Sequence, residues 1–201
     1  MLVTVIVLCV AALCIAHALA SQTVVNITAN VNTTVTCNSV STSTLSFGTL
    51  GAGSIAFTTP ADVSTTISCS DGAGCTLDLN DQGNTSTPGL WNATSSYLIQ
   101  SPALNVTSST STITAGTEGY GIVATTTAAG AGGTLTLINR YNYSTSSAII
   151  GALTTTTLPM ASSTSAITVG REVLTYPEAA ISANTLGGSY NDTLTYSCSG
   201  N

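Results

Sequence analysis

Basic side chains are almost absent from this sequence. It has no lysine, two arginines (Arg140 and Arg171) and one histidine, against eight acidic residues, so its formal net charge is −6. A nucleic-acid-binding surface needs basic side chains to neutralise phosphates, and a polybasic membrane patch needs them too. The composition therefore argues against both nucleic acid and an anionic membrane surface as partners.

The usual catalytic bases are missing as well. Beyond His17, no histidine or lysine is present to activate a nucleophile. Glycosidases use two carboxylates instead, and the candidate pairs are Asp78 with Asp81 and Glu118 with Glu172. Such sites stack sugars on aromatic rings, yet aromatics make up 5% of the chain and one residue is Trp. We expect these acids to be solvated turn residues and the protein not to be an enzyme.

The N-terminal stretch has the features of a secretory signal. Residues 2–19 are almost wholly apolar, and Ala18-Leu19-Ala20 is a small-x-small cleavage site before Ser21. We expect residues 1–20 to be a signal peptide, with no stable membrane span after cleavage. The location that follows is the extracellular space or the cell surface.

An even number of cysteines remains after this stretch. In an exported chain they predict two disulfides, for which three connectivities are open. Zinc is disfavoured because no C-x-x-C pair and no further histidine is present. The spacing of Asp71, Asp78 and Asp81 does not match a calcium loop. We therefore expect disulfides but no metal and no cofactor. The four cysteines are Cys37, Cys69, Cys75 and Cys198.

The low charge does not indicate disorder, because apolar residues are plentiful. They make up 43% of the chain, and the mean hydropathy is +0.42, so a packed core is feasible. Solubility must then come from Ser, Thr and Asn, which also create glycosylation sequons in modest excess over chance. The sequons start at Asn26, Asn32, Asn84, Asn92, Asn105, Asn142 and Asn191.

Strand patterns run through the chain, and no window keeps a helical apolar stripe. From Val25 to Val35 apolar and polar residues alternate, which predicts one long strand. Many short strands separated by Gly- and Asp-rich turns indicate one sandwich or barrel, although the pattern gives no role to the central segment 83–160. Further candidate strands are 44–47, 55–58, 63–69, 75–79, 96–99, 111–114, 121–126, 134–138, 166–169, 173–176 and 192–198.

Two segments resemble a known family. The first runs from Cys37 through Phe47-Gly48 to Ile67-Ser68-Cys69, and the second ends in Gly188-Ser-Tyr190-Asn-Asp192 and an alternating last strand. This pattern is similar to the spore coat protein U domain, which itself resembles pilins of the chaperone–usher type. The resemblance covers about half of the chain, at both of its ends.

The resemblance implies an immunoglobulin-like Greek-key β-sandwich, all-β and pilin-like, over residues 37–201. Residues 21–36 would be an N-terminal extension that acts as a donor strand for a neighbouring subunit, with Val25, Ile27, Val31 and Val35 as its apolar face. The resemblance also implies disulfides Cys37–Cys69 and Cys75–Cys198. The rival scheme is a local Cys69–Cys75 staple together with Cys37–Cys198.

Two functions follow as hypotheses. The first is a secreted structural subunit of a pilus-like fibre or coat, assembled from copies of itself or homologous subunits. The alternative is a monomeric adhesin that binds surface glycans through Trp91, Tyr97 and Tyr120. Loss of assembly on removal of the N-terminal extension would separate the first from the second.

Overall fold

The structure is a computed structural model that describes residues 28–29, 32–39, 44–58, 62–102, 110–145 and 147–201. Residues Thr33–Asn201 form one compact unit, and Met1–Asn32 form another. The expected signal peptide (1–20) and three residues of the expected donor strand (Val25, Ile27 and Val31) lie outside the described residues. None of the described residues belongs to a helix long and apolar enough to cross a membrane.

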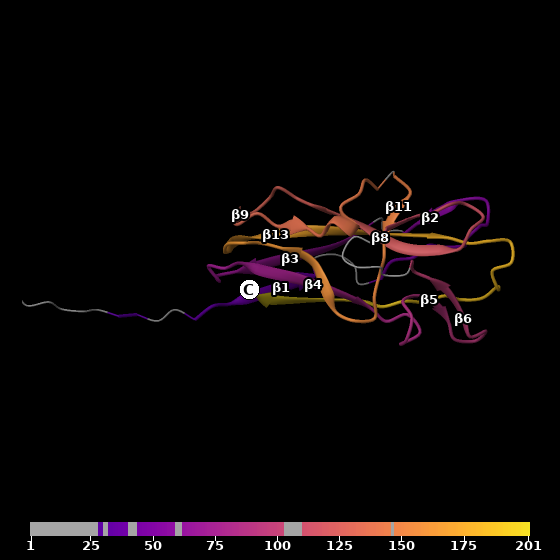
Figure 1. The fold of residues 1–201 in the computed structure, drawn as a ribbon, viewed down its shortest axis with the longest axis horizontal. Helices are drawn as coiled ribbons and strands as arrows, with labels where there is room; N and C mark the ends of the chain where they lie inside the picture. Colours follow the sequence, from indigo (N-terminus) through magenta and orange to yellow (C-terminus); the bar gives the residue numbers. More distant parts are fainter. Residues whose placement is uncertain (1–27, 30–31, 40–43, 59–61, 103–109, 146) are drawn as a thin grey trace, which may run out of the picture. The chain divides into compact units, whose positions relative to one another are not determined.

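Antiparallel sheets make up the unit Thr33–Asn201 (Figure 1). The larger sheet has the order β1-β3-β13-β8-β11-β7, and β2 and β9 pair with β13 outside this path. Its strands are β1 (Val35–Ser39), β2 (Ile55–Phe57), β3 (Val63–Cys69), β7 (Thr110–Thr112), β8 (Gly119–Thr126), β9 (Ala131–Gly132), β11 (Ile149–Gly151) and β13 (Ile167–Ala180).

The second sheet has the order β10-β12-β4-β14, and a separate hairpin joins β5 to β6. A single turn of 3₁₀ helix, η1 (Asn139–Tyr141), is the one helical element of the described residues. These strands are β4 (Cys75–Asp81), β5 (Gly89–Asn92), β6 (Tyr97–Gln100), β10 (Thr136–Leu137), β12 (Leu158–Ser162) and β14 (Leu194–Gly200).

The core lies between the two sheets, as in a sandwich. Along β4, Leu77 and Leu79 are buried while their neighbours Asp78 and Asn80 are partly exposed, because successive strand residues point to opposite faces. Strands of the larger sheet contribute to the same core cluster, for example Ile67. The all-β prediction is therefore confirmed, with two antiparallel sheets packed face to face.

The alternating segments were predicted more accurately than the loop-like ones. Residues 63–69 form β3 as expected, whereas 166–169 and 173–176 belong to one strand, β13. The pairing of β13 with β3 is irregular between Ile167 and Arg171, which the sequence read as a break. The segment 44–47 forms no named strand, and the central segment supplies β5 to β12.

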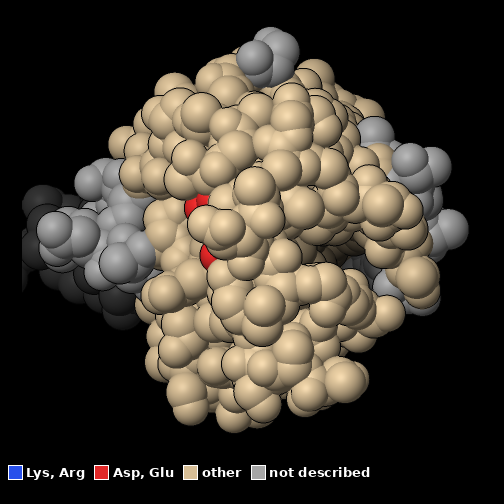
Figure 2. All heavy atoms as spheres, turned by 90° about the vertical axis from the view of Figure 1, so that its right-hand side faces the viewer, with Lys and Arg blue, Asp and Glu red and all other residues tan. Residues whose placement is uncertain are grey.

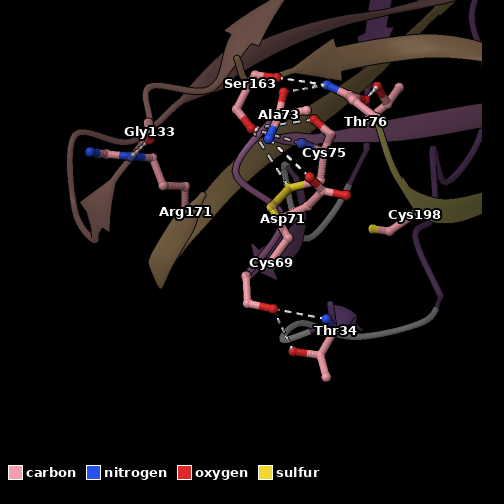
Figure 3. Close-up of a disulfide and its surroundings, with 12 residues drawn as sticks. Thr34, Cys69, Asp71, Ala73, Cys75, Thr76, Gly133, Ser163, Arg171 and Cys198 are labelled. Carbon is pink, nitrogen blue, oxygen red and sulfur yellow. Dashed lines mark hydrogen bonds between the residues drawn. A yellow bond between two sulfur atoms is a disulfide. The ribbon is translucent and has the colours of Figure 1, made fainter. Parts of the chain in front are cut away.

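The two disulfides follow the rival scheme, and the pairing Cys37–Cys69 with Cys75–Cys198 is wrong. Cys37 bonds Cys198. Cys69 bonds Cys75, and Figure 3 shows this second disulfide. The strand register explains the outcome, because Cys37 lies opposite Ile67 while Cys69 lies opposite Val35. Cys69 ends β3 and Cys75 begins β4, so a short turn between the sheets brings those two together.

Candidate functional site

The last strand, β14, forms one edge of the smaller sheet. It pairs with β4 along its whole length, and it has no other partner among the strands that the structure describes. Edge strands present unpaired N–H and C=O groups, which can template the addition of another strand. The edge of β14 is therefore the first candidate interaction site, and we refer to it as the β14 edge.

Side chains at the β14 edge are less buried than those further inside the sandwich. Leu194 and Tyr196 are partly exposed, whereas Leu79, which lies opposite Tyr196 on β4, is 1% exposed. Val35 on β1 is also only partly buried, although it packs against the core. This flank of the core is thus incompletely covered by the described residues.

The Cys37–Cys198 disulfide crosses this flank between the sheets. It holds β1 and β14 with a Cα–Cα distance of 5.8 Å, and the C-terminus lies beside β1 (Figure 1). No strand fits between two backbones at that separation. The accessible part of the β14 edge is therefore the part that precedes Cys198.

Val35 is the expected donor residue that the structure describes, and it belongs to the sheet of its own domain. It begins β1, pairs with Cys69 in its own domain and packs against its own core. Thr34 extends this pairing, since its backbone N–H donates to Ser70 Oγ at 2.9 Å (Figure 3). The pairing within the domain therefore begins before residue 37.

A turn network surrounds the local disulfide. The Ala73 N–H donates to Asp71 Oδ1 at 2.9 Å inside the turn. The Asn201 side chain donates to the Ser163 carbonyl at 2.8 Å, and its Oδ1 accepts from the Thr76 hydroxyl at 2.7 Å. The Asp71 carboxyl group thus accepts a hydrogen bond within its own turn.

At the opposite end of β4, two carboxyl groups meet. Asp81 ends β4 with no exposed surface, and Asp192 precedes β14, where its carboxyl group acts electrostatically on that of Asp81. Burial, followed by the charge of Asp192, raises the pKa of Asp81 from 3.8 to about 8. The sequence pattern missed Asp192 as the partner, because β14 and β4 are joined only in the folded chain.

Backbone N–H groups of two glycines donate hydrogen bonds to this pair of carboxyl groups. The Gly83 N–H donates to Asp192 Oδ1 at 3.1 Å, and the Gly89 N–H donates to Asp81 Oδ1 at 3.3 Å. Gly83 has φ +47° and Gly89 has φ +147°, and a Cβ at either would overlap neighbouring backbone. The turns that present these two N–H groups to the acids thus require glycine, because a side chain would collide with the neighbouring backbone.

The three expected glycan contacts do not come together. Tyr120 is 3% exposed and donates its hydroxyl to Asp192 Oδ2 at 2.8 Å. Trp91 lies opposite Leu98 in the β5–β6 hairpin, whereas Tyr97 lies opposite Asn92, so the two rings are on opposite faces of the hairpin. These residues do not form a shared sugar-stacking surface.

The candidate glycosidase pairs are also separated. Asp78 lies on the outer face of β4 and Asp81 on the inner face. Glu118 precedes the Gly119–Ala180 pair, and Glu172 lies eight residues before Ala180 on β13, which is about 26 Å of strand. Neither pair has the carboxyl separation that glycoside hydrolysis needs.

Metal ligands are scattered in the same way. Asp71 belongs to the turn after β3, whereas Asp78 and Asp81 are on β4. Within the described ranges, no three His, Cys, Asp or Glu side chains are close enough to hold a metal ion. Glu118 instead accepts from the Tyr97 hydroxyl at 2.7 Å and from the Thr185 hydroxyl.

The sequons differ in accessibility. Asn92 is 2% exposed and its Oδ1 accepts from the Thr94 N–H at 3.1 Å, so it caps a turn and is closed to modification. Asn32, Asn142 and Asn191 are exposed, and Asn84 is half-buried. Asn26 and Asn105 lie outside the described residues.

The side chains of both arginines donate hydrogen bonds to backbone carbonyl groups. Arg171 donates to the Gly133 carbonyl at 2.6 Å and to three neighbouring carbonyls of the same loop. Arg140 is buried, donates to the Pro159 carbonyl and lies 4.7 Å from the Tyr141 ring centroid. On the face that Figure 2 shows, no basic atom is visible and acidic atoms form only small spots. That face is therefore dominated by uncharged side chains.

Comparison with protein-family models, curated proteins and solved structures found no match. The functional argument therefore rests on the β14 edge, the disulfides and the chemistry of the surface.

Proposed function

We propose that this chain is an exported structural subunit of the cell surface, which assembles into a pilus-like fibre or coat by accepting a strand from a neighbour. The observation that carries the proposal is the β14 edge, where the last strand lacks an outer partner among the described strands and its inward side chains stay partly exposed. Strand addition supplies main-chain hydrogen bonds and fills such pockets with alternate side chains.

The strand order supports this proposal. The immunoglobulin constant-type sandwich has sheets A-B-E-D and C-F-G. Here β1-β3-β13-β8 follows the first order, with β4 and β14 paired in the second sheet like C and F. No described strand occupies the place of G beyond β14, which is the position that a donor strand would take.

The chemistry of the chain also fits a passive surface role. The two disulfides suit an oxidising compartment. The near absence of basic residues leaves a surface of hydroxyls and amides. In this proposal the donor segment carries Val25, Ile27 and Val31, while Val35 stays in its own sheet.

The donor face provides the test. Val25→Asn with Ile27→Asn changes the apolar face of the alternating segment, and Asn26→Gln with Thr28→Ser changes the other face as a matched control. We expect filaments or oligomers for the wild-type protein and the control, but a folded monomer for the first variant. Light scattering and negative-stain microscopy report assembly, and near-ultraviolet circular dichroism reports folding. A wild-type protein that remains a monomer would overturn the proposal.

A further inference from the structure

In the carboxyl pair at the end of β4, one oxygen of Asp81 is buried without a hydrogen-bond partner among the described residues. Asp81 Oδ2 is buried and accepts no hydrogen bond from any described residue. Its Oδ1 accepts from the Gly89 N–H at 3.3 Å. An ionised carboxylate in such a place would leave a buried charge without compensation.

Asp192 has the opposite surroundings. Its Oδ1 accepts from the Gly83 N–H at 3.1 Å and the Thr193 N–H at 2.7 Å, and its Oδ2 accepts from the Tyr120 hydroxyl at 2.8 Å. Three donors suit the anionic form of a carboxyl group. These surroundings make Asp81 the member of the pair that holds a proton and Asp192 the member that faces it as an acceptor.

The groups that face the pair do not supply a compensating cation. Tyr120 from β8, Tyr196 from β14 and Tyr141 from η1 interact electrostatically with one or both acids. Arg140, the neighbour of Tyr141, is directed to the Pro159 carbonyl and the Tyr141 ring. A second negative charge on Asp81 would thus face an acid, neutral hydroxyls and the Gly89 N–H, and no cation among the described residues.

We propose that Asp81 and Asp192 share one proton. This proton keeps the end of β4 and the start of β14 together, and the contact is lost when the proton dissociates at higher pH. Removing the proton places two negative charges together and separates the two chain segments. A cavity of about 270 Å³ beside the pair, lined by Asp81, Gln82, Thr193 and other polar residues, gives water a route to the ionised carboxylate.

The sign of the effect is fixed by where the proton is bound. Burial and Asp192 raise the pKa of Asp81 from 3.8 to about 8. Between these two pH values the folded chain keeps a proton that the unfolded chain loses, so stability falls as pH rises through this window. Above it the loss levels off. This inference is independent of strand exchange and of the proposed function.

The test compares urea unfolding of the full chain from pH 4 to pH 9 for three proteins. Asp81→Asn keeps a donor to Asp192 that cannot ionise, and Asp78→Asn changes the outward-facing acid of the same strand. We expect the unfolding constant of the wild-type protein to rise about tenfold per pH unit relative to Asp81→Asn across the window. Asp78→Asn should follow the wild-type profile, and equal slopes in all three proteins would overturn the proposal.

A direct measurement covers the case in which Asp81→Asn does not fold. Carbon-13 NMR of the carboxyl groups in the wild-type protein reports which aspartate holds the proton. We expect the Asp81 signal to titrate above pH 7. Titration of Asp81 near its ordinary value of 3.8 would overturn the shared proton, whatever the assembly state of the protein.

Discussion

Strand β4 starts at a disulfide and ends, about 20 Å further on, at a pair of acids. At the first end, Cys75 is covalently tied to Cys69, and Cys198 on the adjacent strand is tied to Cys37. At the second end, Asp81 and Asp192 lie in non-covalent contact with their surroundings and, in our proposal, share a proton. The first end is closed by bonds that reduction would break, whereas we expect the second end to respond to pH. The two ends of β4 are thus held by different interactions, covalent bonds at one end and a carboxyl pair at the other.

The largest expected effect comes from the covalent end. The Cys37–Cys198 link spans 161 residues, whereas Cys69–Cys75 spans 6. Loop-closure entropy then assigns about 5 kcal/mol to the long link and about 2 kcal/mol to the short one. Replacing each pair by alanines and measuring urea unfolding checks this order. A larger loss from the short link would show that local strain or packing dominates instead.

The next effect sharpens the description of the carboxyl end. Tyr120→Phe removes the hydroxyl that donates to Asp192 but keeps the ring that packs edge-on to Phe47. We expect a loss of about 1.5–3 kcal/mol, because the acceptor is charged. Urea unfolding measures the loss, and hydrogen exchange should show faster opening of β14 near Leu194 than near Cys198. Uniform acceleration along β14 would contradict a local role.

A third change separates the pair from another buried acid. Glu178 on β13 has no exposed surface and no hydrogen-bond partner among the described residues, and burial raises its pKa from 4.5 to about 7. The contribution of neutral Glu178 to the free energy of unfolding is fully present below pH 4.5, and it decreases as pH rises toward 7. Glu178→Gln should leave stability unchanged at pH 4 and raise it by about 2 kcal/mol at pH 8. Thermal unfolding at both pH values measures this, and a loss at pH 8 would contradict it.

The smallest effect tests a second non-covalent clamp. Arg171 bridges four carbonyls in the loop that contains β9. Arg171→Lys keeps the charge but not the fork of donors, so we expect a loss of about 1 kcal/mol. Proteolysis should then cut the loop near Gly130 faster, while reduction of the disulfides proceeds as in the wild-type protein. Unchanged proteolysis would show that the loop does not depend on Arg171.

Sequence patterns predicted the parts of this fold that depend on local alternation. β3 and β4 were found because their apolar residues recur at every second position. β12 was missed because Leu158–Ser162 contains a proline and follows a run of threonines. The single strand β13 was divided at Gly170, a position where the absence of a side chain serves packing against Thr66.

Long-range pairings were beyond what the sequence could reveal. The disulfide scheme depends on the register of β1 against β3, which shifts Cys37 from Cys69 by two positions. The pair Asp81–Asp192 likewise depends on β14 returning beside β4. Asp81 was paired with its sequence neighbour Asp78, and its partner in the fold, 111 residues later, carried no local signal. Tyr120 was expected on the surface, yet its hydroxyl serves Asp192 inside.

The Cys37–Cys198 bond also determines how the molecule would carry tension. A pulling force applied to the chain before Cys37 and after Cys198 enters and leaves the domain through the two sulfur atoms. The chain between the two cysteines, which are separated by 161 positions, is then a bypassed loop that bears no load. Under oxidising conditions the domain would transmit force without lengthening, and the sheets would never need to resist it.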